Sequence, residues 1–133
     1  MKKILLDTNF LMICFQFRVD IFLEIERICN FNYKLYVLDK TMDELKNIAK
    51  EQKGKNKDAA KIALKLTSIK NIDVINTKSN KNTDGMILDI ASKEGYIVAT
   101  QDKDLKRRLI NQNATLIVLR QKKILAIVND KGF

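Results

Sequence analysis

Short apolar runs that alternate with helical patterns are the feature that most restricts how this chain can fold. Five runs have the length and apolar content of buried strands, at positions 2–7, 34–39, 72–76, 96–100 and 114–119. Between them, apolar residues recur at helical spacing within 18–31, 42–52, 59–66, 82–95 and 104–110. Because parallel strands need helical crossovers, the pattern predicts an α/β fold with three layers, α/β/α, around a central, mostly parallel sheet of about five strands.

The ends of several elements carry recognisable signals. Thr41 is expected to cap the helix after the second strand, and Asn82 or Thr83 the helix before the fourth, which Gly95 should end. The run at 122–128 is expected to be an edge strand or a tail element. One helical face should carry Ala59, Ile62, Ala63 and Leu66.

Length and composition favour one soluble unit. With 133 residues and no linker or repeat, we expect a single domain over residues 1–133. The basic start followed by an apolar run is interrupted by Asp7 and Asn9, so we expect no signal peptide, no membrane contact and a cytoplasmic location. Cys14 and Cys29 lack CxxC spacing and are interpreted as reduced core thiols.

The charge balance and the absence of histidine narrow the chemistry. Twenty-five basic and 16 acidic side chains give a net charge of +9, which favours a polyanionic partner. The chain has no histidine, and so lacks the usual general base, the usual zinc ligand and the triad partner of a nucleophile. Any hydrolytic chemistry must therefore depend on carboxylates, which prefer hard cations such as Mg²⁺ or Mn²⁺.

Four acids are expected at one edge of the sheet. Asp7 ends the first strand and Asp102 follows the fourth. Asp84 is expected at the start of the helix that leads into the fourth strand, and Glu44 in the first turn of the helix after the second strand. Ligands of such sheets bind beyond the carboxyl ends of the strands, so these side chains should converge there. Clustered carboxylates repel one another unless a cation neutralises them, which predicts a metal site; Asp104 is a fifth candidate.

Each acid also has a purely structural interpretation. Asp7 could cap a following helix, and Asp84 could stabilise its own helix through the helix dipole. Glu44 could form a capping box with Thr41, and Asp102 could be a turn residue. Taken singly these readings are at least as strong as the functional one, so the prediction depends on the joint placement of the acids.

Four stretches resemble the successive acidic motifs of the PIN-domain nucleases, in order and across nearly the whole chain: LLDTNFLM, TMDEL, TDGMILDIA and IVATQDKDL. The stretch YIVATQDKDLKRRL is more similar to the archaeal and eukaryotic rRNA-processing branch than to the VapC-type toxins. Gly85 departs from the pattern, because the processing relatives often carry another acid there. With only two cysteines, the chain also lacks the zinc ribbon that some of those relatives append.

The resemblance implies a PIN-like sheet of Rossmann-like topology and an endoribonuclease that cleaves single-stranded RNA, leaving 5′-phosphate and 3′-hydroxyl ends. It implies one or two Mg²⁺ or Mn²⁺ ions, and RNA, including structured rRNA precursors, as the partner. A homodimer, ribosome-assembly factors or an antitoxin are further expected partners. The implied catalytic and metal-binding acids are Asp7, Glu44, Asp84 and Asp102, with Asp104 assisting and with Thr8, Asn9 and Thr100 as polar partners.

Basic residues are expected to hold the RNA backbone beside the acids. The nearest in sequence are Lys103, Lys106, Arg107 and Arg108. A longer track is expected from Lys53, Lys55, Lys57, Arg120, Lys122 and Lys123, and from Lys46, Lys50 and Lys61. For the lysines around Gly54, a solvated surface is an equally good explanation.

Three other functions compete with RNA processing, which we favour. A toxin ribonuclease would share the site and have a small cognate inhibitor. A catalytically silent scaffold of the same fold would bind RNA without cutting it. A phosphoacceptor receiver domain would need an acid at the end of the third strand, where Asn76 stands.

Overall fold

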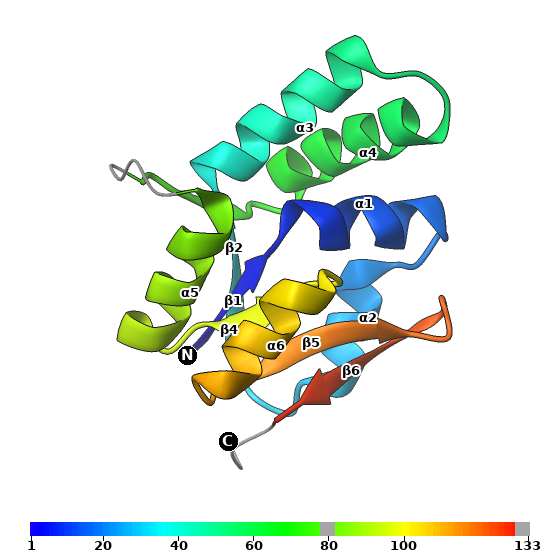
Figure 1. The fold of residues 1–133 in the computed structure, drawn as a ribbon. Helices are drawn as coiled ribbons and strands as arrows, with labels where there is room; N and C mark the ends of the chain where they lie inside the picture. The colour runs from blue at the N-terminus through cyan, green and yellow to red at the C-terminus, as the bar shows by residue number, and fades with distance from the viewer. Residues whose placement is uncertain (78–81, 130–133) are drawn as a thin grey trace.

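The computed structural model describes residues 1–77 and 82–129, which form a six-stranded sheet flanked by helices (Figure 1). The strand order is β3-β2-β1-β4-β5-β6, parallel from β3 to β5, with β6 antiparallel at the edge. The strands are β1 (Lys2–Leu6), β2 (Tyr33–Leu38), β3 (Asp73–Ile75), β4 (Ile97–Ala99), β5 (Leu116–Arg120) and β6 (Ile124–Val128). The helices are α1 (Thr8–Gln16), α2 (Ile21–Ile28), α3 (Asp39–Glu51), α4 (Lys55–Ile69), α5 (Thr83–Glu94) and α6 (Lys103–Asn111).

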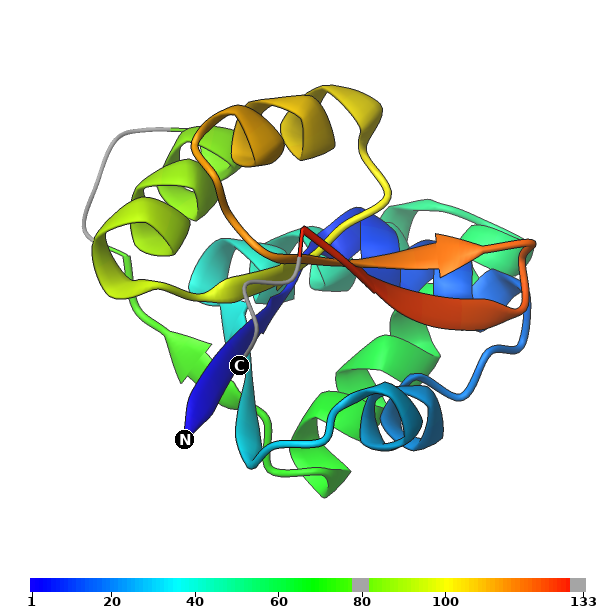
Figure 2. The ribbon, with the colours of Figure 1, turned by 90° about the horizontal axis from the view of Figure 1, so that it is seen from below.

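Both faces of the sheet are covered, which explains why β4 and the second half of β1 are apolar on both faces. Along β1, Ile4 and Leu6 belong to one core cluster and Leu5 to the other, because successive side chains point to opposite faces. Helices α1 to α4 pack on the first face, and α5 and α6 on the second (Figures 1 and 2). The predicted three-layer α/β/α architecture is confirmed, with the run at 122–128 supplying β6.

The strand order reverses between β1 and β4. The chain moves outward from β1 to β3 on one side, then crosses through α5 to β4 and continues to β5 and β6 on the other. In sheets of this kind, the crevice outside the carboxyl ends of the strands at this reversal is the usual ligand site. The N-terminal ends of α1, α3, α5 and α6 gather at this edge (Figure 1).

The first crossover contains one helix more than predicted. A separate helix, α1, begins directly after Asp7, and α2 follows only after a turn at Phe17–Asp20. Residues 10–15 are all apolar, so they show no helical periodicity. Arg18, with φ of 57°, adopts the left-handed conformation that separates the two helices.

Two other local predictions were wrong. Helix α3 begins at Asp39, not after Thr41, and its N-cap Leu38 makes no side-chain hydrogen bond. Thr41 lies inside the helix and is fully buried. On α4, Ile62 is 45% exposed, while small residues form the buried face. Alanines there allow α4 to approach α1 and α3 closely.

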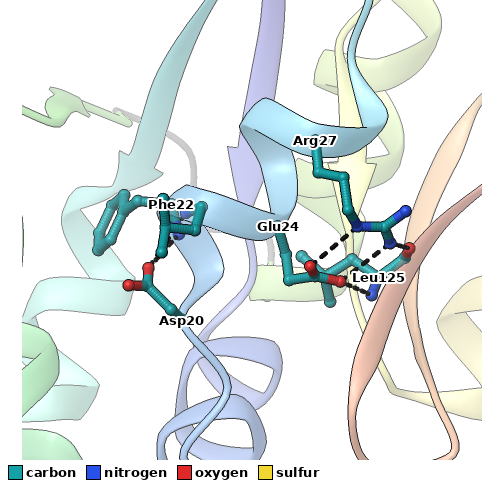
Figure 3. Close-up of polar contacts among 6 residues, drawn as sticks. Asp20, Phe22, Glu24, Arg27 and Leu125 are labelled. Carbon is teal, nitrogen blue, oxygen red and sulfur yellow. Dashed lines mark hydrogen bonds and ion pairs between the residues drawn. The ribbon is translucent and has the colours of Figure 1, made fainter.

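The edge strand β6 is covered by side chains from α2 (Figure 3). Glu24 Oε1 accepts the Leu125 N–H (2.9 Å), and Arg27 Nη2 donates to the Leu125 carbonyl (3.1 Å). Arg27 Nε also pairs with Glu24 at 2.9 Å, while Asp20 caps the helix by accepting the N–H groups of Phe22 and Leu23. The Glu24–Arg27 pair therefore takes the place of a neighbouring strand and blocks further pairing at this edge.

Two other predictions concern the cysteines and the membrane. Both cysteines are free thiols: Cys14 lies within the first core cluster, and the partly buried Cys29 packs against it. Burial raises the pKa of Cys14 to about 12 and that of Cys29 to about 11. Such thiols are unreactive, which agrees with their predicted core role. No helix within residues 1–77 and 82–129 is long and apolar enough to cross a bilayer.

Candidate active site

Asp7 is held between β1, α1 and β4. Its Oδ1 caps α1 by accepting the Thr8 N–H (2.9 Å), and its Oδ2 accepts the Thr100 hydroxyl (2.8 Å). Its own N–H donates to the Ala99 carbonyl at 3.0 Å. The capping interpretation of Asp7 is therefore correct, but the cap occupies only one carboxylate oxygen directly, while the other faces the end of β4.

The carboxyl group of Asp7 is unusually basic. Only 7% of the residue is exposed, and this burial raises its pKa to about 6 from an ordinary 3.8. The bonds from Thr100 and Thr8 oppose the rise, while the charges of Asp84 and Glu44 add to it. Asp7 is thus a buried carboxyl group within electrostatic reach of two others.

Thr100 joins Asp7 to Asp102. Its hydroxyl donates to Asp7 and accepts the Asp102 N–H (3.2 Å), and the residue is fully buried. Asp102 in turn caps α6, because its Oδ1 accepts the Leu105 N–H (2.9 Å). A single threonine therefore fixes the relative position of two of the predicted acids.

Gln101 anchors this loop and was missed at the sequence level. Its amide forms two hydrogen bonds with the Leu119 backbone, accepting from the N–H (2.7 Å) and donating to the carbonyl (3.1 Å). Its backbone N–H donates to Asn9 Oδ1 at 3.2 Å. The side chain thus extends the contact between β4 and β5 past the end of β4, and its position between two predicted site residues was the only available signal.

Glu44 approaches from α3, in its second turn rather than its first. The alternative interpretation of Glu44, a capping box with Thr41, does not hold: the Thr41 hydroxyl accepts the Thr8 hydroxyl (3.0 Å), and the Thr83 hydroxyl donates to Glu44 (3.3 Å). Burial raises the pKa of Glu44, the hydroxyls of Thr83 and Thr8 oppose the rise, and Asp84 adds to it. The Thr8–Thr41 bond also joins α1 to α3.

Asp84 lies in the first turn of α5 and faces the other acids. Asn82 caps this helix by accepting the backbone N–H of Gly85, the divergent position, at 2.7 Å. Burial and then the charge of Asp102 raise the pKa of Asp84, Arg108 lowers it, and Asp104 raises it again. Asp84 therefore experiences the field of acids on a separate helix, as well as that of its own helix.

The four acids line one cavity of about 380 Å³. Asp7, Glu44, Asp84 and Asp102 reach it from four separate segments of the chain. Among residues 1–77 and 82–129, no three Asp, Glu or Cys side chains are already placed to share one metal ion. The other residues of the lining are Thr8, Asn9, Met12, Ile13, Ile48 and Thr83.

Asp104 lies outside this lining. It does not cap α6, since Asp102 does, and α6 begins one residue before it. Its carboxylate instead pairs with Arg107 and, at 3.7 Å, with Arg108. Its side chain is 55% exposed. The fifth predicted acid is thus engaged with the basic face of its own helix.

Comparison with known proteins supports one family. A family model described as PIN like domain matches residues 4–122. The chain belongs to this PIN-like family. Ribonuclease VapC4 of Methanocaldococcus jannaschii is 34% identical over 127 residues, covering 96% of this chain and 97% of the relative. Ribonuclease VapC9 of Archaeoglobus fulgidus is 29% identical over 118 residues, covering 88% and 82%.

A solved structure shows the same fold. The PIN domain endonuclease Utp24 superposes with a TM-score of 0.78 at 21% identity, covering 96% of this chain and 92% of that one. At this identity the likeness establishes the fold. The resemblance read from the four acidic motifs is thus confirmed at the level of the family and its architecture.

The predicted basic track of this PIN-like domain is divided into three groups. Helix α6 carries the group next to the acids, and Arg108 is close enough to Asp84 to lower its pKa. Lys53, Lys55 and Lys57 lie beyond the far end of α3, roughly 12 Å along the helix axis from Glu44.

The third group lies at the β5–β6 hairpin. Lys122 there stands over the Phe17 ring at 5.2 Å, and with Lys123 lines a separate hollow beside α2. Arg120 ends β5 next to them. None of these basic residues lines the acidic cavity itself, and among the three groups the α6 group is the one in which a residue, Arg108, acts on the pKa of a cavity acid.

Proposed function

We propose that this PIN-like domain is a metal-dependent endoribonuclease that hydrolyses phosphodiester bonds of single-stranded RNA. One observation carries the proposal: Asp7, Glu44, Asp84 and Asp102, from four segments of a chain without histidine, line a common cavity. Burial first, and the neighbouring acids second, raise the pKa values of Asp7, Glu44 and Asp84, a combination that is common at functional sites. Structural caps alone do not require four acids in one place.

The donor set fits a hard divalent cation. Carboxylate oxygens are the preferred ligands of Mg²⁺ and Mn²⁺, and a cation would relieve the repulsion among these acids. Asp7, Asp84 and Asp102 would hold one or two ions once their side chains rotate towards a shared ion, with Glu44 as a further ligand or as the group that orients water. Bound ions of this kind activate water and stabilise the leaving oxygen of a phosphodiester.

Other side chains would position these acids and the substrate. Thr100 and the Thr8 N–H hold Asp7 in a fixed orientation, and Thr100 also fixes the start of α6. Asn9 supports the same loop through Gln101. Lys103, Lys106 and Arg108 would contact phosphates on either side of the cleaved bond, since they share α6 with the cap Asp102. Asp104 would act mainly by orienting Arg107 and Arg108.

RNA as substrate is supported by two independent features. The net charge of +9 favours a polyanion, and the two curated relatives are both named ribonucleases. We further propose that residues 1–133 act as one nuclease domain in the cytosol. Homodimers and ribosome-assembly factors remain predicted partners.

Two biological roles fit the same chemistry. The motif at positions 96–109 favours RNA processing. The names of the relatives, VapC4 and VapC9, favour a toxin controlled by an antitoxin. Expression in growing cells separates the roles: a toxin arrests growth and is rescued by a neighbouring gene product, whereas a processing enzyme leaves growth intact.

Cleavage of labelled single-stranded RNA in MnCl₂ tests the chemistry. Wild type should cut to give 5′-phosphate ends, EDTA should stop it, and Asp102→Asn should lower the rate at least about a hundredfold. Asp43→Asn is the matched control, because Asp43 is an exposed acid next to Glu44 on α3 and does not line the cavity. Tight binding without cutting of several RNAs would instead favour the silent scaffold.

A further inference from the structure

One side of the acidic cavity is apolar, and the proposed hydrolysis makes no use of it. Met12 and Ile13 of α1 and Ile48 of α3 line the cavity beside the acids. Their side chains offer no conventional hydrogen-bonding group to a metal or a phosphate. A site that handled only charged groups would leave this wall without a function.

Helix geometry places this wall one turn beyond the polar groups. On α1, Met12 and Ile13 follow Thr8 and Asn9 by four residues, and on α3 Ile48 follows Glu44 by four. Residues four apart lie on the same helix face, displaced by about 6 Å along the axis. On each of the two helices, the side that lines the cavity therefore changes from polar to apolar within one turn.

The wall is preorganised. Met12 is 8% exposed, and Ile13 and Ile48 are half-buried and pack against the first core cluster. A ligand that contacts them meets side chains whose rotamers are already restricted, so little further entropy is lost on binding.

Neutral amides lie farther along α1 and beyond the end of α3. The Gln16 amide donates to Asn56 Oδ1, and the Asn56 amide donates to Gln52 Oε1 (2.7 Å). These residues connect α1, α4 and the end of α3. Along the helices, the apolar wall therefore lies between the acids and these uncharged, hydrogen-bonded side-chain amides.

We propose that Met12, Ile13 and Ile48 form a nucleobase shelf, which contacts the face of a base next to the cleaved phosphodiester. The base is the part of an RNA strand whose faces are apolar, whereas phosphates would lose hydration against such a wall. A cavity of about 380 Å³ lies within the range of small-ligand sites. This inference rests on the proposed function and adds the orientation of the strand.

The chemistry of the shelf predicts weak base preference. Aliphatic side chains and a polarisable thioether contact any base through its face, and they have no polar group with which to read its edges. The shelf therefore positions the strand and does not select a sequence.

Equilibrium binding tests the shelf without requiring cleavage. Asp102→Asn protein is titrated with fluorescent pentanucleotides in MgCl₂, each lacking the base at one position. At one position, loss of the base should weaken binding about tenfold. In the double variant Asp102→Asn, Ile48→Ala, removal of the same base should weaken binding less than about threefold, because the shelf is already incomplete.

The matched control is Ile62→Ala in the same background. Ile62 is an isoleucine on α4, 45% exposed and outside the cavity, so the full tenfold effect should persist. Ile48→Val, which keeps most of the side chain, should give an intermediate value and guards against misfolding of the alanine variant. Two results would overturn the shelf, even if cleavage assays establish the nuclease: an equal loss of affinity whichever of the five bases is missing, or a full tenfold effect that persists in Ile48→Ala.

Discussion

At the scale of single residues, Asp7 combines two roles that the sequence left as alternatives. It caps α1 through Oδ1 and is bound by Thr100 through Oδ2, yet it is buried near Glu44 and Asp84. An N-cap residue with no second function could be asparagine or serine, which cap a helix without carrying a charge. The raised pKa of Asp7 means that its site in the fold favours the protonated carboxyl group over the ionised one.

Asp7→Asn should therefore stabilise the metal-free protein at neutral pH. Because the folded pKa of Asp7, about 6, exceeds its ordinary 3.8, the folded state holds the proton more tightly, and stability falls as pH rises from about 4 to about 6. The variant lacks this ionisable group, so above pH 6 its free energy of unfolding should exceed that of wild type by up to roughly 3 kcal/mol. Urea unfolding in EDTA from pH 4 to 7.5 measures it; a difference that does not grow with pH contradicts the shift.

Gln101 is expected to act as a positioning residue for Asp102. Gln101→Ala removes both bonds to Leu119 and should lower kcat about tenfold while KM for RNA changes little. Gln112→Ala is the matched control, because the Gln112 amide also donates to a backbone carbonyl, that of Leu88 (2.9 Å), away from the cavity. Equal losses of kcat in the two variants would mean that Gln101 acts only on stability.

At the scale of elements, α6 joins an acidic cap to a basic body. Its N-cap is Asp102, which lines the cavity, and its exposed surface carries Arg107 and Arg108, ordered by Asp104. The abrupt change of charge along this segment follows from the helix, because the cap faces the acids and the next turns face solvent. In the proposed reaction, phosphates beside the cleaved bond would therefore contact the cations of α6, while the acids would hold the metal.

Arg107→Ala combined with Arg108→Ala should weaken RNA binding and lower its salt dependence. Each lost phosphate contact should reduce the slope of log K against log salt by about 1. The matched control is Lys65→Ala with Lys93→Ala, which removes the same charge from exposed sites on α4 and α5. Similar slopes for both double variants would remove α6 from the RNA path.

The contacts of Glu24 and Arg27 on α2 with Leu125 of β6 should contribute to stability and should protect this edge of the sheet. Glu24→Ala leaves the Leu125 N–H without its partner and should lower the free energy of unfolding by about 1 kcal/mol. Amide exchange at Leu125 should become faster. Glu26→Ala is the control, as Glu26 is an exposed acid on the same helix. An unchanged rate of amide exchange at Leu125 in Glu24→Ala would show that these contacts do not protect the sheet edge.

At the scale of the whole molecule, four segments that meet at the reversal of strand order form the site. Their charge repulsion should oppose folding until a cation binds the folded state. Saturating MgCl₂ or MnCl₂ should therefore raise the Tm of wild type by about 5–10 °C. NaCl of equal ionic strength should give a much smaller rise. Calorimetry or dye-based melting measures the shift.

The same measurement on Asp7→Asn links stability to the site. In EDTA, this variant should have a higher Tm than wild type. Mg²⁺ or Mn²⁺ should raise its Tm much less than that of wild type, because its cavity carries one negative charge less. If divalent ions raise neither protein's Tm, a shared metal site among these acids is wrong. If they raise both equally, the ions bind elsewhere.

The sequence was sufficient where the signal is local and repeated. Alternating strands and helices predicted the three-layer sheet, because each strand is short, apolar and followed by a helical crossover. The ends of the strands placed Asp7 and Asp102 at one edge, since parallel strands share a direction. Gly95 ended α5 as predicted, in the left-handed conformation that its missing Cβ allows.

Only the tertiary structure decided which groups meet and what they do. The Thr8–Thr41 bond spans 33 positions, and Gln101 reaches Leu119 18 positions away, so no local pattern could reveal either. Asp39, the first residue of α3, accepts hydrogen bonds from the Thr77 N–H (3.0 Å) and hydroxyl (2.7 Å), 38 positions away, which no local pattern indicates either. Local sequence sets the elements, but the electrostatics of the site arise from burial and from distances between segments, which exist only after the chain has packed.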